Sequence, residues 1–531
     1  MKKFLILISS VILLSACSES LLEPFTPGEI LDEGIAIQTS GQLQSVLNTG
    51  YNIMTNREEA VFTSVYTDEA VPGFNNGGQG VSGGSNYFNF QVLPDSNAGD
   101  IWGTNYAATA YFNLVLKYVD VIKPTSTSDV LLLKRIKADA LVMRAFAHTK
   151  VLPYYSGNLT SDNALAGIIA NKWEGSTAFS SKNPRSTNAV YYAFVHKDLD
   201  DAIAIYADPN VPTPSLIERN FQPGISLARA LKARMFLYRK DYVNAELFAN
   251  LVINTSGITI ASRTALTTVF HTHDSAPTVE VIFKLRRTGQ QNAQGANLHN
   301  GWVSVANRRT GSPFYEVSRS LFNVLNPTNA PTVVGVNDSR AFLVTRSSAP
   351  PPSVAGSLIN PNWATDPNVL GGDILVTFKH GGASAATGTN GFNPDFIQMR
   401  ISEMHFIIAE ARAYADDFLN VGSRLKLITD RRLVNPSAAL TFTTRQEALR
   451  AILDERRKEL CFEGFRFVDL KRLYQDAGLT AFDRHPVDYI GLGFPGGNPS
   501  NFVFTNNYKW ALPIPQGEIN ANPNVAQNPG Y

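Results

Sequence analysis

The sequence predicts a mainly helical scaffold with a few short strands and large irregular insertions. Candidate helices occupy most of the chain between residues 40 and 255 and return after residue 396. Between them, over about 256–395, Gly, Pro, Asn and Ser recur without a helical period, and a stretch this long without periodicity is usually functional or disordered. A second irregular stretch, VPGFNNGGQGVSGGSNYFNF, separates the first two candidate helices. We therefore expect one scaffold with insertions, ending in C-terminal helices and a tail over about 396–531.

The helix candidates of the first half are 42–57, 105–122, 131–151, 189–207, 226–239 and 243–254. Within 226–239, Ala230, Ala233 and Leu237 fall at i, i+3 and i+7, which is one face of a helix. A short turn follows, and the next helix opens with Ala245 and Ala249 on one face. Two helices that are joined by a tight turn and meet through small residues resemble a tetratricopeptide unit.

The second half begins with the irregular part, in which EVIFKLRR is the clearest strand candidate. Its scattered aromatic residues, which include Tyr315, Phe342 and Trp363, argue against disorder. The segment DFIQMRISEMHFIIAEARAYADD is expected to be helical because its apolar residues line one face. Another helix is expected at about 444–463, and a shorter one after it. The last fifty residues, rich in Pro, Asn and Gly, are expected to wrap over the surface.

The chain begins with a predicted secretory signal. Lys2 and Lys3 precede a mostly apolar run that ends at Leu14, the charged and apolar regions of such a signal, and the run is too short to span a bilayer. The residues LSAC that end at Cys17 resemble a bacterial lipobox, in which the signal is cut before the cysteine. We expect residues 1–16 to be removed and Cys17 to carry lipid that anchors the protein. Residues 17–531 should then form a single domain.

The composition narrows the class of partner. The chain has 46 basic and 45 acidic residues, a balance that argues against nucleic acid as a ligand. Charged residues make up 17%, below the usual quarter, and the difference is filled by Asn, Ser, Thr and Gln. A neutral, amide-rich surface suits an uncharged polyhydroxylated ligand. Because Cys461 has no cysteine left to pair with once Cys17 is acylated, we expect it to be a small buried hydrophobe.

The most charged stretch, ERRKELCFEGFRFVDLKRLY, contains two carboxylates one helical turn apart, Glu459 and Glu463. Paired carboxylates are the machinery of glycosidases, but such pairs lie in a cleft and usually come from different elements. Four neighbouring arginines would hold these acids ionised, so we predict no catalytic residue here. These arginines are Arg456, Arg457, Arg466 and Arg472.

We interpret the same stretch as a corner between two helices. Gly464 stands where a helix C-terminus favours a left-handed residue. Arg466, Asp469 and Arg472 lie at successive i+3 steps, so their side chains are expected to bond one another. Ion pairs would then tie the two helices together.

Two segments are weak candidates for a metal site. The segment HTHD places His271, His273 and Asp274 together, and the two histidines would share a face of a strand, but no third ligand cluster with zinc spacing accompanies them. The segment DSNAGD offers oxygen donors from Asp95 to Asp100 without the spacing or the terminal Glu of an EF-hand loop. We therefore predict no metal and no cofactor.

Aromatic residues in the irregular parts are the best candidates for ligand contact, because sugar rings stack on aromatic rings while side-chain amides bond their hydroxyls. We expect the ligand site around Asp68, Phe74, Asn75 and Tyr87, joined by Trp302 from the later insertion. If these residues are not involved, the next candidates are Trp173 and Trp363.

Several motifs together resemble the SusD/RagB family of lipid-anchored outer-membrane nutrient-binding proteins of Bacteroidetes. They are the lipobox, IWGTNYAATAYFNLVL, ALVMRAFAHTKVLPYYSG, PRSTNAVYYAFVHKDLDDAI, LARALKARMFLYRKDYVNAELFANLVI, ISEMHFIIAEARAYA, ERRKELCFEGFRFVDLKR and the ending LPIPQGEINANPNVAQNPGY. His148 and the pair Pro153-Tyr154 depart from the family pattern, and Trp102 matches a tryptophan at a helix start that we treat as core. The resemblance covers nearly the whole chain.

The resemblance implies an all-α fold of four tetratricopeptide-like helix pairs with an irregular ligand-binding part. It also implies a partner, a SusC-type TonB-dependent outer-membrane transporter, and no catalysis. The expected function is capture of an oligosaccharide or polysaccharide at the cell surface and its delivery to that transporter. Capture of peptides or another nutrient by the same fold is the alternative, and a surface glycosidase or a protein-binding scaffold is less favoured.

Overall fold

The structure is a computed structural model that describes residues 37–55, 57–73, 86–174, 181–214, 220–271, 278–286, 302, 314–325, 338–346, 375–377, 379, 395–435, 437–490 and 502–531. It is mainly helical, as the sequence predicts. The helices are α3 (Ser40–Ile53), α4 (Arg57–Tyr66), α6 (Asp100–Tyr118), α7 (Thr127–Tyr155), α8 (Asn188–Tyr206), α9 (Ile225–Tyr238), α10 (Tyr242–Thr255), α11 (Leu266–His271), α13 (Arg319–Leu325), α14 (Ile401–Tyr414), α15 (Phe418–Thr429), α16 (Arg445–Leu460), α17 (Arg466–Leu473), α18 (Val487–Ile490) and α19 (Gln516–Ala521).

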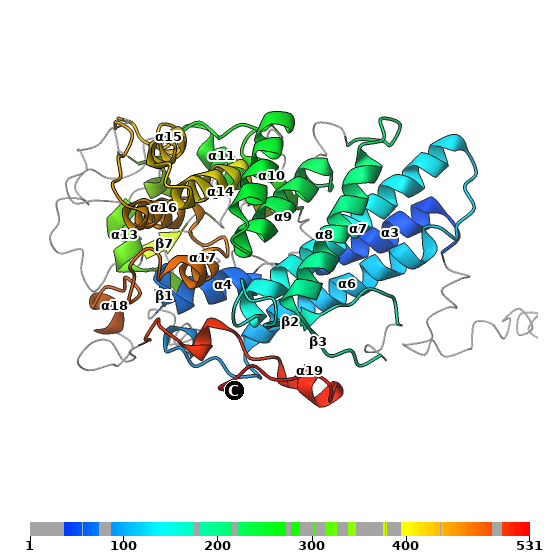
Figure 1. Cartoon of the computed structure of the whole chain (residues 1–531), viewed down its shortest axis with the longest axis horizontal. Helices are drawn as coiled ribbons and strands as arrows, with labels where there is room; N and C mark the ends of the chain where they lie inside the picture. The colour runs from blue at the N-terminus through cyan, green and yellow to red at the C-terminus, as the bar shows by residue number, and fades with distance from the viewer. Residues whose placement is uncertain are drawn as a thin grey trace, which may run out of the picture.

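The scaffold is a row of helices in which each packs on the next in the order α3, α6, α7, α8, α9, α10, α14 and α15. Figure 1 shows α3, α6, α7 and α8 side by side at one end, α14, α15 and α16 at the other, and α9 and α10 between them. Taken two at a time, the eight helices of this row form four pairs in the described chain, α3–α6, α7–α8, α9–α10 and α14–α15. This is the helix-pair architecture that the resemblance implied.

The pair α9–α10 shows why the sequence folds in this way. Ala230 and Ala233 of α9 and Ala245 and Ala249 of α10 are fully buried. Small side chains let the two helix backbones approach closely, and the Asp241 side chain caps α10 by accepting a hydrogen bond from the Asn244 backbone N–H at 3.2 Å. The predicted tetratricopeptide-like turn is confirmed.

The strands form four two-stranded antiparallel pairs among the described residues. The pairs are β1 (Ala70–Pro72) with β5 (Tyr315–Val317), β2 (Leu165–Ile168) with β3 (Arg185–Thr187), β4 (Val281–Leu285) with β8 (Phe396–Arg400), and β6 (Val344–Arg346) with β7 (Leu375–Thr377). The predicted strand EVIFKLRR is β4. The pairs β1–β5 and β4–β8 join segments far apart in the sequence, so they attach the irregular part to the scaffold, whereas β6 and β7 both lie within the irregular part.

The segment DFIQMR was expected to begin a helix, and this expectation was wrong. Phe396–Arg400 is the strand β8, all five of its residues are buried, and the helix α14 starts only at Ile401. A short apolar run cannot be assigned to helix or strand from its period alone. The strand forms because β4, more than a hundred residues earlier, offers it a partner.

Six of the described helices were not predicted, namely α4, α11, α13, α15, α18 and α19, and the longest of them are α4 and α15. The candidate 42–57 ends in the structure at Ile53, and a separate helix, α4, follows it. The helix α15 was also missed, although it has an Asp417 cap and apolar residues that face α14. In contrast, the helices expected at about 444–463 and just after it are confirmed as α16 and α17.

The C-terminal tail wraps over the scaffold, as expected. Leu512 donates its backbone N–H to the carbonyl of Tyr154 at 2.7 Å, and Gln516 donates to the carbonyl of Pro94 at 2.8 Å. Trp510 lies in the core, with its ring centroid 5.4 Å from that of Phe467 in α17. Figure 1 shows α19 and the C-terminus along one long edge of the molecule. The tail is therefore part of the fold.

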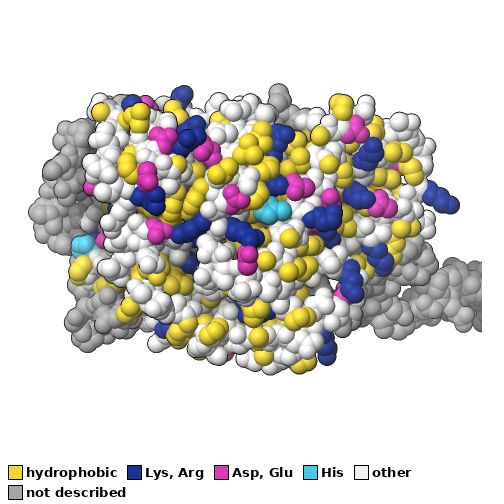
Figure 2. Space-filling view, in the orientation of Figure 1, with side chains coloured by type: hydrophobic (Ala, Val, Ile, Leu, Met, Phe, Trp, Pro, Cys, Tyr) yellow, Lys and Arg dark blue, Asp and Glu magenta, His cyan; other side chains and the backbone are white. Residues whose placement is uncertain are grey.

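The face of the molecule in Figure 2 carries lysines and arginines interspersed with aspartates and glutamates, among apolar and uncharged side chains. This mixture agrees with the balance of charges in the sequence. Within the described parts of the chain, none of the helices combines the length and the apolar character that crossing a membrane requires.

Candidate functional site

The segment after α4 and the later insertion meet, as the predicted ligand site requires. β1 pairs with β5, with Ala70 opposite Val317. The Ser318 hydroxyl donates a hydrogen bond to the backbone carbonyl of Asp68 at 2.6 Å. Trp302 lies beside Tyr315, with ring centroids 5.4 Å apart. The two segments are neighbours even though some 230 residues separate them in the sequence.

Asp68 is buried, so the structure does not place its carboxylate where a ligand could reach it. Arg466 donates to both carboxylate oxygens at 2.8 Å, and Arg457 lies 3.5 Å from one of them. Burial by itself raises the pKa of Asp68, but these two arginines outweigh it and hold the pKa well below its usual range. The carboxylate acts as a structural anchor, which corrects our expectation that it contacts ligand.

Trp302 is also buried, with none of its surface exposed. Its ring packs against Tyr315 and against Phe462, whose centroid is 5.1 Å away in an edge-to-face contact. The ring fills the space between the insertion and the corner after α16, and it is not available for stacking on a sugar. Two other expected contacts, Phe74 and Asn75, lie outside the described residues, as does Trp363.

Among the predicted ligand residues that the structure describes, Tyr87 borders a surface depression. Its ring is buried edge-to-face against Phe62 at 5.5 Å, and its hydroxyl donates a hydrogen bond to Glu58. Burial raises the pKa of Glu58 and, together with the Glu58 carboxylate, raises that of Tyr87 well above its usual value. Beside this pair lies a groove of about 360 Å³, which we call the amide groove. It is lined by Asn86, Tyr87, Gln91, Leu93, Asp95, Ser96 and Asn97.

The chemistry of the amide groove suits a polyhydroxylated ligand. Asn86, Gln91, Asp95 and Asn97 are exposed, so their amide and carboxylate groups can donate to and accept from hydroxyls. Leu93, 58% exposed, adds an apolar surface for the C–H face of a sugar ring. Asp95 and Asn97 belong to the segment DSNAGD, which was a weak candidate for calcium. Gln91 and Ser96 were not predicted. The many amide side chains that follow the aromatic residues Tyr87 and Phe88 could have indicated this stretch, but they do not single out these two residues.

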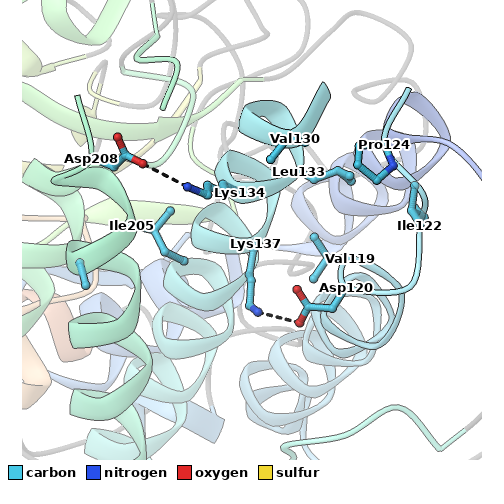
Figure 3. A pocket seen from close by; sticks show the side chains of 11 residues that line it. Val119, Asp120, Ile122, Pro124, Val130, Leu133, Lys134, Lys137, Ile205 and Asp208 are labelled. Atoms are coloured by element: carbon cyan, nitrogen blue, oxygen red, sulfur yellow. Dashed lines mark hydrogen bonds and ion pairs between the residues drawn. The ribbon is translucent and has the colours of Figure 1, made fainter. Parts of the chain in front are cut away.

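A larger hollow lies between the ends of α6, α7 and α8, with a volume of about 570 Å³. Figure 3 shows its lining, in which Val119, Ile122 and Leu133 face the same space. The lysines at its edges are already paired, Lys134 with Asp208 at 3.2 Å and Lys137 with Asp120 at 2.6 Å. An apolar lining with its charges paired offers few partners for sugar hydroxyls, so we do not choose it as the sugar site.

The carboxylate pair of the charged stretch is locked into ion pairs. Glu459 lies 2.8 Å from both Arg400 and Arg432, and Glu463 lies 2.7 Å from Arg400 and 2.6 Å from Lys379. All of these side chains are buried. Burial would raise the pKa of Glu459, but Arg432 and Arg400 hold it well below its usual range. A carboxylate held in this way can act neither as a general acid nor as an exposed nucleophile.

The cations around this pair are not the ones that the sequence suggested. Arg400 ends β8, directly before α14, and Arg340 and Lys379 come from the loop-rich part. The four arginines expected there bind other acids, as follows: Arg456 binds Asp469 at 2.7 Å, Arg466 binds Asp68 at 2.8 Å, Arg472 binds Glu410 at 2.7 Å and Asp469 at 3.1 Å, and Arg457 binds Asp483 at 2.7 Å. The expected bond between Asp469 and Arg472 is confirmed, but the one between Arg466 and Asp469 was wrong, because Asp68 takes the Arg466 guanidinium.

The corner itself is confirmed. α16 ends at Leu460 and α17 begins at Arg466, and Gly464 between them has a φ of +90°, in the left-handed region. Gly464 lies in the loop before α17, a few residues later than a C-cap of α16 would stand. Cys461 is buried, and burial raises the pKa of its thiol to about 12, which fits a packing role. Trp102 is buried, as expected, and donates from Nε1 to Glu518 at 3.2 Å.

No group of three or more His, Cys, Asp or Glu side chains that could hold a metal ion occurs among the described residues. His271 ends the helix α11 and does not lie on a strand, contrary to our expectation. His273 and Asp274 lie outside the described residues. Trp173 is partly buried against the core.

Two family models match the chain. One, described as "SusD family", matches residues 371–531, and the other, a SusD-like model described as "Starch-binding associating with outer membrane", matches residues 30–236. The two matched ranges do not overlap and together cover more than half of the chain. No curated protein sequence matches it.

Several solved structures share this fold over nearly its full length. A SusD superfamily protein from Bacteroides thetaiotaomicron has a TM-score of 0.70 at 23% identity, with 92% of this chain and 100% of that chain covered. A putative sugar binding protein from Bacteroides vulgatus has a TM-score of 0.70 at 21% identity, with 93% and 99% covered. A SusD-like carbohydrate binding protein from Bacteroides vulgatus has a TM-score of 0.68 at 18% identity, with 92% and 98% covered. At these identities the likeness establishes the fold.

Proposed function

Because this chain belongs to the SusD/RagB family, we propose that it captures an oligosaccharide or polysaccharide at the outer surface of a bacterial cell. The amide groove is the observation that carries the proposal for this chain. Exposed Asn86, Gln91 and Asn97 offer paired donors and acceptors beside the apolar surface of Leu93. Such a surface matches a sugar ring, which has hydroxyls at its edge and C–H groups on its faces.

We further propose that the bound glycan passes to a SusC-type TonB-dependent transporter, and that lipid on Cys17 keeps the protein at the outer membrane. The lipobox-like sequence before Cys17 supports the anchor, and the family description of association with the outer membrane supports the location. We also propose binding without turnover, which the locked state of Glu459 and Glu463, the acid pair that first suggested a glycosidase, supports.

Titration of neutral oligosaccharides into the mature protein, without its lipid, tests the groove. We expect binding in the micromolar-to-millimolar range, because a few hydrogen bonds of about 1 kcal/mol each and one apolar contact supply only modest free energy. Gln91→Ala and Asn97→Ala should each weaken this binding by about fivefold, which corresponds to about 1 kcal/mol. Both side chains are exposed, so the melting temperature should not change.

The matched control is Gln44→Ala, which removes a partly exposed amide from α3 that bonds Asn48 at 3.0 Å and lines neither the amide groove nor the hollow beside α6. It should bind oligosaccharide like the wild type. If the two groove variants also bind like the wild type, the ligand site lies elsewhere. If a peptide pool binds and no glycan in an array does, the nutrient is a peptide and our choice of ligand is wrong.

A further inference from the structure

A second polar pocket lies between the end of α7, α17 and the C-terminal tail, and it shares no lining residue with the amide groove. Its volume is about 320 Å³, at the small end of the range for ligand pockets, about 300–1,000 Å³. The residues around it include Lys240, Lys471 and Arg472, the ring of Tyr474, and the amides Gln475 and Asn506. No aspartate or glutamate is among its lining residues in the described chain.

The three cations of this pocket differ in how they are neutralised. Lys240 is paired with Asp476 at 2.7 Å, and Arg472 is paired with Glu410 at 2.7 Å. Lys471 instead donates to two backbone carbonyls at the end of α7, those of Pro153 at 2.8 Å and Ser156 at 2.5 Å. An ammonium group has three N–H donors, so two carbonyls leave one for a further acceptor. Lys471 is thus the cation in this pocket whose described contacts include no carboxylate.

We propose that this pocket is a second ligand site, which binds the carboxylate of an acidic sugar such as a hexuronic acid. Lys471 supplies the countercharge, because a carboxylate that accepts its remaining N–H would complete the coordination of the ammonium. Burial lowers the pKa of Lys471 to about 7, as expected for a desolvated cation that lacks an acidic partner. That the ligand is a sugar rests on the proposed function. That it carries a carboxylate rests on the residues that line this pocket.

The other walls suit a single sugar residue. Tyr474 is partly buried and stacked on Trp510, with ring centroids 5.7 Å apart and an angle of 10° between the rings, so its position is fixed by the core. Gln475 and Asn506 are exposed at the rim. A fixed aromatic ring, a cation and exposed amides are the groups that would hold a ring with one carboxylate and several hydroxyls.

The test uses two probes with nearly the same ring, D-galacturonate and D-galactose, titrated into the mature protein by ligand-observed NMR. We expect galacturonate to bind at least about tenfold more tightly, which corresponds to about 1.4 kcal/mol, because hydrogen bonds to charged groups contribute more than neutral ones. K471M should remove this preference and K471R should keep it. K240M should keep most of it, because Asp476 already neutralises Lys240.

Lys471 also holds the end of α7, so K471M could fail to fold. Q475E avoids this problem, because it places a carboxylate on an exposed rim residue. It should weaken galacturonate binding by about tenfold more than it weakens galactose binding, because the added carboxylate repels only the charged probe. Equal affinity of the wild type for the two probes would overturn the proposal, and so would unchanged galacturonate binding in Q475E. Gln91→Ala in the amide groove should leave the galacturonate preference intact, so failure of one site is distinguishable from failure of the other.

Discussion

Asp68 lies just after α4, and its carboxylate is held between two arginines that follow nearly four hundred residues later. Arg466 bonds both oxygens, and Arg457 bonds the Asp68 carbonyl at 2.5 Å. Each of the three side chains is buried. A buried charge is stable only beside its partners. Removing one partner therefore lowers the free energy of unfolding by more than the intact ion pair adds to it.

Asp68→Ala should therefore destabilise the fold by about 3–5 kcal/mol, the usual cost of leaving a buried charge without its partner. Unfolding in urea measures this change. Asp95→Ala in the amide groove is the control, and because Asp95 is exposed its effect should stay within about 0.5 kcal/mol. A D68A protein with wild-type stability and weaker oligosaccharide binding would return Asp68 to the ligand site.

The neighbouring Glu69 predicts a dependence of stability on pH. Its carboxyl group is buried and accepts from the Ser64 hydroxyl at 2.9 Å and from the Phe462 N–H at 3.1 Å. Burial raises its pKa from 4.5 to about 7. Between these values the folded protein holds a proton that the unfolded chain releases, so the stability that this group contributes at low pH is lost as the pH rises towards 7.

Glu69→Gln removes this titration. The free energy of unfolding of the wild type, relative to that of E69Q, should fall by about 3 kcal/mol between pH 4.5 and pH 7, as follows from 1.36 kcal/mol per pKa unit. Chemical denaturation of both proteins across this range is the measurement. Curves that stay parallel would mean that Glu69 is ionised in the folded protein throughout.

At the scale of elements, the corner between α16 and α17 determines how the first helices meet the last ones. The Tyr154 hydroxyl shares its proton between two acceptors, the carboxylate of Glu59 at 2.7 Å and the carbonyl of Gly464 at 3.0 Å. Lys150 lies 2.6 Å from Glu59 on its other side. The corner is thus joined to both α4 and α7.

Gly464→Val should destabilise the protein by about 1–3 kcal/mol, because a β-branched residue is strained at a φ of +90°. A Cβ at this position would also lie 3.1 Å from the side chain of Glu59. Thermal unfolding measures the loss. Gly157→Val is the control, because its Cβ would meet nothing within 4 Å and its backbone is not left-handed. An unchanged melting temperature with lost ligand binding would instead assign Gly464 a functional role.

At the scale of the whole molecule, buried ion pairs attach the loop-rich part to the scaffold. Arg340 and Lys379 reach Glu459 and Glu463 of the corner, and Arg400 at the end of β8 joins them to Glu280 of the irregular part at 3.0 Å. We infer from this shared network that the scaffold and the irregular part unfold together, and a single domain over residues 17–531 stays a prediction.

Cys17→Ala should release the protein from the membrane into the soluble fraction, because the lipid is its only expected source of membrane affinity. Fractionation of cells that express wild type or variant measures the release, and palmitate labelling should be lost with it. Labelling of the variant equal to that of the wild type would show that the lipid is attached elsewhere.

The sequence by itself determined the helical scaffold, the tetratricopeptide-like turn at Asp241 and the corner at Gly464, since these depend on local patterns: apolar period, cap and backbone conformation. Only the tertiary structure decided β8 and the partners of Asp68 and Glu459, because these depend on segments that are distant in the chain. The candidate ligand residues show the same limit. The sequence around a tryptophan that lies among Asn, Gly and Ser is the same whether its ring faces solvent or is buried, as the ring of Trp302 is. Burial depends on which residues pack around the ring, and these come from distant parts of the chain.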